Sequence, residues 1–340
     1  MTAAGRRAVT VLSGFLGSGK TTLLRRYLAG HSGAGVVVII NECGAVGVDH
    51  HLVRMVQEQS VVLQGGCVCC TRREDLVGEL RELLDLEQSG RLAPLRHVVI
   101  ETSGIADPVP VLFSLATDPV LRHHFAPASV VVTLDALNAA AQIDRQPEVR
   151  KQIIAADRIV VTKADLAPRE AIAHHRIRVR QLNPTAKISV SRMGDASEVL
   201  AAGAAADADA DADHVRRLPA DYDPGALSTH AGVRSIALGF NVPLDWPVFG
   251  VWLGMLLQVR GPDVLRIKGL LDIGDAGPVV MNAAQHVVHP PEHLPAWPAG
   301  ADRSYLVFIT RGIDPARIAE SLETFQRAGG RSDLRVRELA

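Results

Sequence analysis

The residues with the clearest chemistry lie near the start of the chain, in the segment GFLGSGKT at residues 14–21. It fits the pattern G-x-x-x-x-G-K-[ST], in which glycines bring backbone N–H groups against phosphate oxygens and the lysine reaches the β- and γ-phosphates. The threonine hydroxyl of this pattern binds Mg²⁺. The segment therefore predicts a nucleotide-phosphate site, with contacts from Gly14, Gly17, Ser18, Gly19, Lys20, Thr21 and Thr22.

Two glutamates follow runs that are typical of buried strands. Glu42 comes after GVVVII and Glu101 after VVI, and ligands of an open parallel sheet bind at the carboxyl ends of its strands. We expect Glu101 to hold Mg²⁺ directly or through water, and the N–H of Gly104 to contact the γ-phosphate. Glu42 either positions water or a metal, or caps its loop. The predicted catalytic residues are Lys20, which stabilises charge, with Glu42 or Glu101 orienting the attacking water.

A third segment predicts which base is bound. Residues 158–161 are a further buried run, and Thr162, Lys163 and Asp165 of the tetrapeptide TKAD follow it. A carboxylate at Asp165 can accept hydrogen bonds from both N1–H and the exocyclic amine of guanine, a donor pair that adenine lacks. Lys163 would pack over the base. The nucleotide is therefore expected to be GTP or GDP.

All four cysteines of the chain, Cys43, Cys67, Cys69 and Cys70, lie between residues 43 and 70. Thiolates suit Zn²⁺ or Cu(I), and the last three cysteines, beside two glycines, can converge on one ion. The fourth ligand stays open among Glu42, Cys43, a histidine, water and a group on another protein. Two other interpretations remain: Cys67 and Cys70 form a C-x-x-C redox pair, or the cysteines pack as small apolar residues.

Composition narrows the class of protein. A chain of 340 residues predicts two domains, at about 150 residues for each. The formal net charge of −1 leaves no excess of Lys and Arg to neutralise a nucleic acid, so no nucleic-acid partner is expected. The longest apolar stretch, around Trp252, is too short to cross a membrane. We therefore expect a cytoplasmic protein with no membrane partner.

The order of the segments predicts an α/β fold. A P-loop GTPase domain with a mostly parallel sheet is expected over residues 1–192, and a smaller α+β domain over residues 231–340. Between them, residues 193–230 include an alanine- and aspartate-rich stretch with no apolar face to bury, which predicts a flexible, solvated linker.

The motifs GFLGSGKTTLL, NECGAVGVD, GGCVCC, ETSGIADP and TKAD occur in this order, followed by a small domain that carries RIKG. This set resembles the CobW-type family of P-loop GTPases, of the SIMIBI class, which includes nitrile hydratase activator-like proteins. The resemblance implies slow GTP hydrolysis coupled to delivery of zinc, or of another divalent metal such as cobalt, to a client metalloprotein. Metal binding would fall to Cys67, Cys69 and Cys70, and the client would dock on the C-terminal domain.

Two alternatives to metal delivery stay open: a nucleotide-dependent regulatory switch and a thiol redox regulator. The sequence also leaves open whether the chain forms a homo-oligomer.

The chain departs from the family pattern at several positions. NECGA stands where NEFGE is usual, so Ala45 replaces an acid and Cys43 adds a thiol. This leaves the geometry and the preference of the metal site open. Thr162 stands in place of the usual asparagine, and we expect its hydroxyl still to hydrogen-bond the loop.

Overall fold

The computed structural model describes residues 6–30, 35–40, 62–64, 73–126, 129–193, 195, 198–200, 232–274, 277–298 and 304–339. Backbone contacts divide the chain into two compact units, Met1–Arg176 with Ala186–Asp207 and Ile177–Thr185 with Ala208–Ala340. The described residues form two β-sheets, one in each unit.

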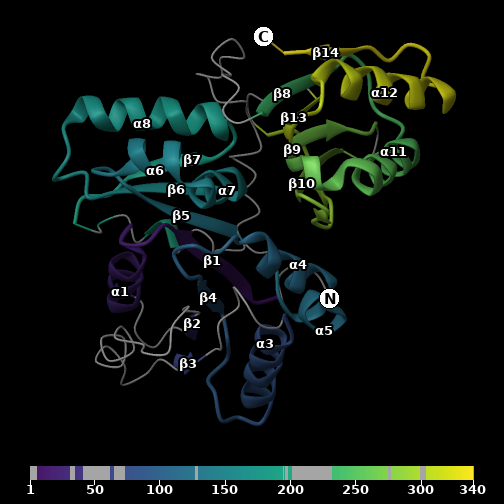
Figure 1. Ribbon diagram of the computed structural model, residues 1–340. Helices are drawn as coiled ribbons and strands as arrows, with labels where there is room; N and C mark the ends of the chain where they lie inside the picture. The colour runs from purple at the N-terminus through teal and green to yellow at the C-terminus, as the bar shows by residue number, and fades with distance from the viewer. Residues whose placement is uncertain are drawn as a thin grey trace. The chain divides into compact units, whose positions relative to one another are not determined.

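The first sheet has seven strands in the order β3-β2-β4-β1-β5-β6-β7, and all of its neighbouring strands run parallel (Figure 1). The strands are β1 (Ala8–Gly14), β2 (Val36–Ile40), β3 (Val62–Gln64), β4 (His97–Glu101), β5 (Ser129–Asp135), β6 (Arg158–Thr162) and β7 (Lys187–Val190). The predicted parallel α/β fold is confirmed.

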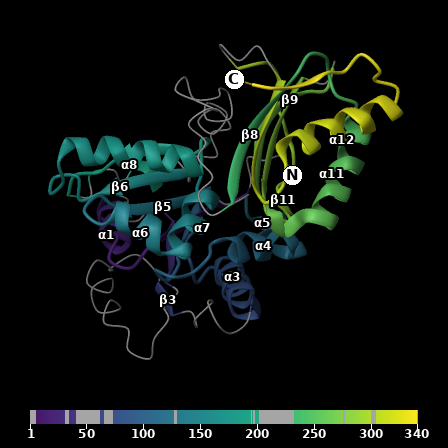
Figure 2. The same cartoon turned by 45° about the horizontal axis from the view of Figure 1, so that its top comes forward.

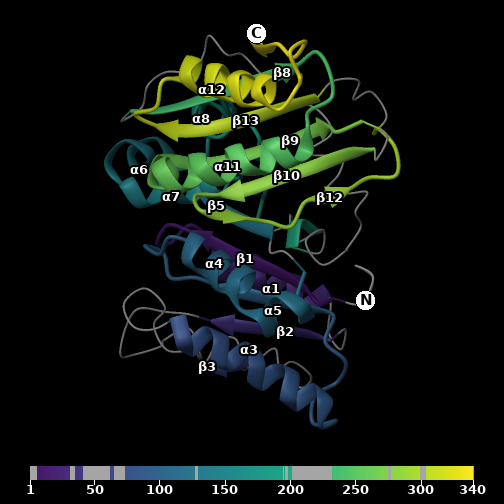
Figure 3. The same ribbon diagram turned by 90° about the vertical axis from the view of Figure 1, so that its right-hand side faces the viewer.

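Helices cover both faces of this sheet (Figure 1), and its inner strands are buried along their whole length. Every residue of β1, β2, β4, β5 and β6 is buried, which a strand achieves only when both faces are covered. The helices are α1 (Lys20–Gly30), α3 (Arg73–Gln88), α4 (Val109–Thr117), α5 (Pro119–His124), α6 (Ala139–Arg145), α7 (Pro147–Ala155) and α8 (Arg169–Leu182). Figures 1 and 3 show α1 on one side of the sheet and α3, α4 and α5 on the other.

The core under α1 joins segments that are distant in the sequence. Leu24 and Tyr27 of α1 pack with Val99 and Val131 of the sheet, and Leu200 belongs to the same core cluster. Leu200 is fully buried, so the chain still packs on this sheet within the range predicted as a linker.

The second sheet is antiparallel. Its order is β11-β10-β9-β13-β8-β14, and β12 also pairs with β10. The strands are β8 (Val233–Phe240), β9 (Val264–Asp272), β10 (Pro278–Ala284), β11 (Val287–Val288), β12 (Glu292–His293), β13 (Ser304–Arg311) and β14 (Val336–Glu338). Figures 2 and 3 show α11 (Trp246–Arg260) and α12 (Pro315–Ala328) on one face of this sheet, where Phe249, Trp252, Phe308 and Leu322 form its core.

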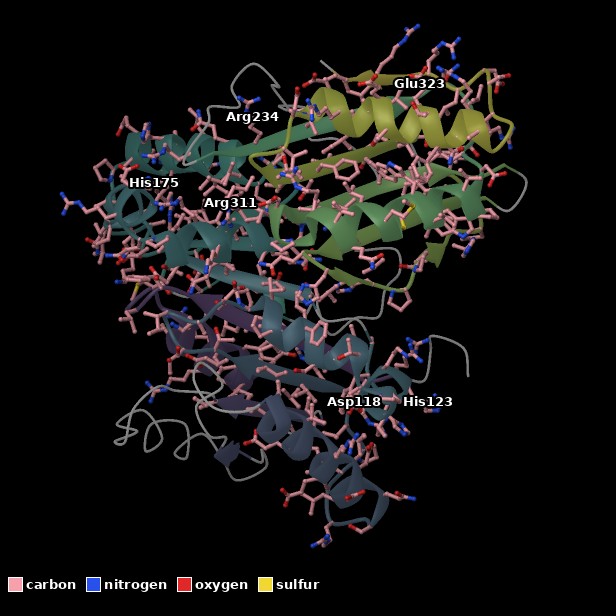
Figure 4. All side chains as sticks on the ribbon, turned by 45° about the vertical axis from the view of Figure 1, so that its right-hand side comes forward. Asp118, His123, His175, Arg234, Arg311 and Glu323 are labelled. Atoms are coloured by element: carbon pink, nitrogen blue, oxygen red, sulfur yellow. The ribbon has the colours of Figure 1, made fainter. Side chains whose placement is uncertain are left out.

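Aspartates begin three of the helices. Asp118, labelled in Figure 4, accepts hydrogen bonds from the N–H groups of Val120 and Leu121 at the start of α5. Asp245 and Asp314 cap α11 and α12 in the same way. In each case a proline follows in the first turn, where its missing N–H would have had no helical partner. These local signals define where the three helices begin.

Candidate functional site

A cavity of about 500 Å³ lies at the carboxyl end of β1 and β4. Its lining combines the P-loop (residues 14–21), the loop that follows β4, and one residue from the end of β6. The lining residues are Leu16, Gly17, Ser18, Gly19, Lys20, Thr21, Thr22, Glu101, Thr102, Ser103, Gly104, Ile105 and Lys163. The structure thus brings together most of the described residues that the sequence predicted for nucleotide binding.

The P-loop takes a conformation that needs its glycines. Gly14, Gly17 and Gly19 have φ values of +138°, +69° and +93°, which residues with a Cβ rarely adopt. A Cβ on Gly14 would also lie 2.3 Å from Thr133 Oγ1. This close approach seats the loop on the end of β5, where Thr133 Oγ1 and Ser18 Oγ are 2.6 Å apart and buried.

Lys20 is held against its own loop. It is only 9% exposed, and its Nζ donates to the carbonyl oxygens of Gly14 at 2.9 Å and Phe15 at 3.3 Å. The loop therefore fixes the ammonium group beside the first turn of α1. Anions bind favourably at such a helix start, because free N–H groups and the helix dipole both point toward them.

Two oxygen atoms that could ligate a metal ion meet at the edge of the cavity. Thr21 Oγ1 donates to Glu101 Oε1 over 3.0 Å, and Glu101, the last residue of β4, is 3% exposed. The pairing of β1 with β4 places Glu101 beside Leu12, just before the P-loop. A hydroxyl and a carboxylate next to a phosphate-binding loop are a donor set that suits Mg²⁺, so these residues fit that ion.

Gly104 lies directly against the P-loop. A Cβ on Gly104 would come within 2.6 Å of the backbone nitrogen of Leu16, so only glycine allows this approach. Nearby, Thr102 Oγ1 donates to Ser13 Oγ over 3.0 Å. The loop after β4 is therefore closed onto the P-loop at the position where Gly104 could reach a terminal phosphate.

Thr162 links the base-binding motif to the P-loop. Its Oγ1 donates to the carbonyl oxygen of Ser18 at 2.6 Å and to that of Leu134 at 3.2 Å. The expectation that threonine keeps the loop hydrogen bond is confirmed. Asp165 is exposed and accepts a hydrogen bond from the N–H of Met193 at 3.2 Å, so its carboxylate can be reached from solvent.

Asp135 supports the cavity residue Lys163, a role that the sequence did not predict. Its Oδ2 accepts from Lys163 Nζ at 2.8 Å, and Lys163 itself has a left-handed backbone, with φ +56°. Burial alone would raise the pKa of Asp135, but hydrogen bonds from Lys163, Asn138 and the N–H of Leu137 outweigh it and lower the pKa below its usual value. An acid at the end of a buried strand, as at Glu101, was the available signal.

The predicted metal residues are not tested by the structure. Glu42, Cys43, Cys67, Cys69 and Cys70 all lie outside the described residues. Within the described ranges, no group of three or more His, Cys, Asp or Glu side chains could hold a metal ion. The same part of the chain contains no helix that is both long and apolar enough to cross a membrane.

Comparison with known proteins decides the family. The profile described as "CobW/HypB/UreG, nucleotide-binding domain" matches residues 8–190, more than half of the chain. The chain belongs to this family. A second profile, the cobalamin synthesis protein cobW C-terminal domain, matches residues 233–326. The CobW-type resemblance seen in the motifs is thereby confirmed for both parts of the chain.

Several characterised relatives of this CobW-family chain carry names that refer to zinc. It is 37% identical over 188 residues to the zinc chaperone YjiA of Escherichia coli, which covers 55% of the chain and 58% of YjiA. It is 34% identical over 202 residues to zinc-regulated GTPase metalloprotein activator 1 of Schizosaccharomyces pombe, covering 56% of the chain and 48% of the relative. These two alignments span about half of each relative. The zinc chaperone CobW of Pseudomonas aeruginosa is 29% identical over 352 residues, covering 93% of the chain and 90% of that protein.

Solved structures extend the similarity to both domains. The CobW-family chain superposes on Zn(II)-bound YjiA GTPase from E. coli with a TM-score of 0.67 and 27% identity, covering 94% of the chain and 99% of YjiA. A Zn(II)-bound triple mutant of YjiA GTPase gives a TM-score of 0.70 at 26% identity, with the same coverage. The family fold therefore includes the second, antiparallel domain as well as the P-loop domain.

Proposed function

We propose that this chain binds and hydrolyses GTP and uses the nucleotide cycle to deliver zinc, or another divalent metal such as cobalt, to a client metalloprotein. The observation that carries the GTPase part is the joint placement of Lys20, Thr21, Glu101, Gly104 and Lys163 around one cavity. The zinc part is supported by the names of the relatives and by the Cys67, Cys69 and Cys70 motif.

In this proposal the chain's own residues do the following work. Lys20 stabilises the charge that develops on the transferring phosphoryl group. Thr21 and Glu101 would hold Mg²⁺, which supplies charge neutralisation for the β- and γ-phosphates when it is bound. The oxygen of water bonds to the γ-phosphorus in line with the breaking bond to the β–γ bridging oxygen, giving GDP and phosphate. Because Glu101 already contacts Thr21, Glu42 is the better candidate to orient that water.

Guanine would be read at the other end of the site. Asp165 accepts from the base, Lys163 packs over it, and Thr162 ties this motif to the P-loop. Gly14, Gly17, Ser18, Gly19 and Thr22 complete the phosphate-binding loop.

The metal site and the partners complete the proposal. Cys67, Cys69 and Cys70 would bind zinc, with Glu42 or Cys43 as further ligands, and thiolate ligation requires the reduced state of a cytoplasmic location. The client would dock on the C-terminal domain, taken as residues 231–340, which follows the linker. A homo-oligomer is compatible with this scheme.

The test is a chelator-competition titration of Zn²⁺ against the reduced protein, loaded in turn with Mg²⁺-GDP and with Mg²⁺ and a non-hydrolysable GTP analogue. A tenfold difference in zinc affinity, about 1.4 kcal/mol of coupling, is expected if hydrolysis drives uptake or release. A variant with Cys67, Cys69 and Cys70 all changed to Ser should lose the site. Equal affinities in the two nucleotide states would exclude coupled delivery and favour a regulatory switch. A reversible Cys67–Cys70 disulfide without zinc binding would instead favour the redox alternative.

A further inference from the structure

A buried glutamine on α7 contacts the loop that carries Gly104. Gln152 is 1% exposed, and its Nε2 donates to the carbonyl oxygen of Gly104 at 3.2 Å and to that of Ala106 at 3.0 Å. The helix that presents it lies against β1 and β5, the strands on which the P-loop is seated. The side-chain amide of Gln152 therefore ties two peptide groups of the loop after β4 to α7.

The orientation of this amide is fixed by its partners. Both partners are carbonyl oxygens, which only accept hydrogen bonds, so the nitrogen of the amide and not its oxygen must face the loop. In the described structure, the Oε1 atom is buried without a hydrogen-bond donor. A buried acceptor without a donor destabilises a fold, and an apolar side chain would avoid this cost. Packing alone therefore does not account for glutamine at this position.

The loop that Gln152 holds is the one that touches the P-loop. Gly104 approaches the backbone of Leu16 so closely that a Cβ would not fit, and Gly104 lines the cavity together with Lys20 and Thr21. The carbonyl of Gly104 faces α7 and is engaged by Gln152. Gln152 thus favours the closed position of the loop, in which Gly104 lies at the phosphate end of the cavity.

We propose that Gln152 is a positioning residue that holds the Gly104 loop against the P-loop and thereby makes the site prefer a nucleoside triphosphate over a diphosphate. This inference rests on the proposed guanine-nucleotide function. A γ-phosphate gains from a closed Gly104 loop, whereas a diphosphate is bound by the P-loop and the base motif. Loss of the two hydrogen bonds should therefore weaken triphosphate binding selectively.

The experiment compares Gln152→Met, which keeps the length and removes the donor, with wild type and with the exposed control Gln88→Glu. We expect Gln152→Met to bind a non-hydrolysable GTP analogue about tenfold more weakly, or about 1.4 kcal/mol, and GDP less than about twofold more weakly. The control should match wild type for both. Equal losses for the two nucleotides, or no loss for either, would overturn the proposal.

One further measurement, hydrogen exchange, keeps the inference testable apart from the proposed function. In the nucleotide-free protein, backbone amides of residues 103–107 should exchange with deuterium about tenfold faster in Gln152→Met than in wild type, since loop opening is eased. Unchanged exchange rates would overturn the positioning role of Gln152, whether or not wild type binds guanine nucleotides. A failure of wild type to bind guanine nucleotides would separately refute the proposed function.

Should Gln152→Met fail to fold, Gln152→Glu provides the same test. Its carboxylate repels the two carbonyl oxygens, whereas its protonated form can donate one hydrogen bond. Analogue affinity relative to GDP should therefore recover as the pH is lowered, and the absence of any pH dependence beyond that of wild type would contradict the proposal.

Discussion

The two sheets of this chain differ in what their topology can assemble. In the parallel sheet, every strand ends at the same edge, so β1, β4, β5 and β6 deliver Gly14, Glu101, Asp135 and Thr162 to one place. In the antiparallel sheet, neighbouring strands point in opposite directions, and their ends are shared between two edges. The cavity at the P-loop is accordingly lined by residues of the domain that holds the parallel sheet.

The sheets also differ in how they are stabilised. The parallel sheet buries aliphatic, largely β-branched strands on both faces. The antiparallel sheet is covered by α11, and the rings of Phe249 and Trp252 from that helix pack in one aromatic group with Phe308 of β13. Each sheet therefore has its own core, and the cavity residues belong to the parallel sheet and its loops. A core substitution in the antiparallel sheet should lower stability without touching the cavity.

The largest effect on stability is expected from Phe308→Ala in the antiparallel sheet. Phe308 is fully buried, and its ring meets that of Trp252 edge to face at 6.2 Å. The substitution should lower the free energy of unfolding of this domain by about 3–5 kcal/mol, while the affinity for GTP stays unchanged below the unfolding transition. Denaturant unfolding of the full chain and a nucleotide titration measure the two quantities. A parallel fall in nucleotide affinity would show that the two sheets are not independent.

The converse result is expected from Lys20→Ala in the P-loop. Removing an ammonium group from the site of charge development should reduce GTP hydrolysis by about 100- to 1,000-fold, and nucleotide affinity should fall as well. The unfolding free energy should change little, because the hydrogen bonds from Lys20 to Gly14 and Phe15 stay within its own loop. Single-turnover hydrolysis measures the loss, with exposed Lys187→Ala as the matched control. Retained hydrolysis would place the phosphate site elsewhere.

The smallest effect is expected on how stability depends on pH in the acid range, through Asp135, the partner of Lys163. The pKa of Asp135 is lower in the folded chain than its usual value, which is ~4 for an aspartate. A lowered pKa stabilises the fold above the unfolded pKa, and the stabilisation is lost as the pH falls through the folded pKa. At pH ~7 the free energy of unfolding of wild type should therefore be about 1 kcal/mol higher than that of Asp135→Asn. The difference is modest because Lys163, the partner of Asp135, is partly exposed.

Urea unfolding of both proteins across the acid range measures this difference. The two stabilities should converge as the pH falls below the unfolded pKa. A difference that is constant with pH would mean that the hydrogen bonds to Asp135, and not its charge, stabilise this end of the site.

The P-loop could be predicted from sequence because its chemistry is local. Eight consecutive residues at 14–21 fix the backbone path, the helix start and the lysine. Apolar runs likewise predicted strands at residues 35–40 and 158–161, where the structure has β2 (Val36–Ile40) and β6 (Arg158–Thr162). In such segments, the residues that determine the structure are neighbours in the chain.

Other features depend on distant partners and emerged only from the structure. Arg266 and Lys268 lie within a strand, yet they are 2% and 7% exposed, which their charge alone would not suggest. The helices between residues 109 and 155 were not predicted, and Gln152 on the last of them gave no sequence signal.

The sequence by itself determined the phosphate loop, the buried strands and the order of the motifs, and with them the family. The tertiary structure alone decided which side chains support those motifs. Thr133 meets Ser18 across 115 residues, Asp135 meets Lys163 across 28, and Gln152 meets Gly104 across 48. The physical reason is that strand order in a parallel sheet, not distance along the chain, sets which strand ends and loops lie together.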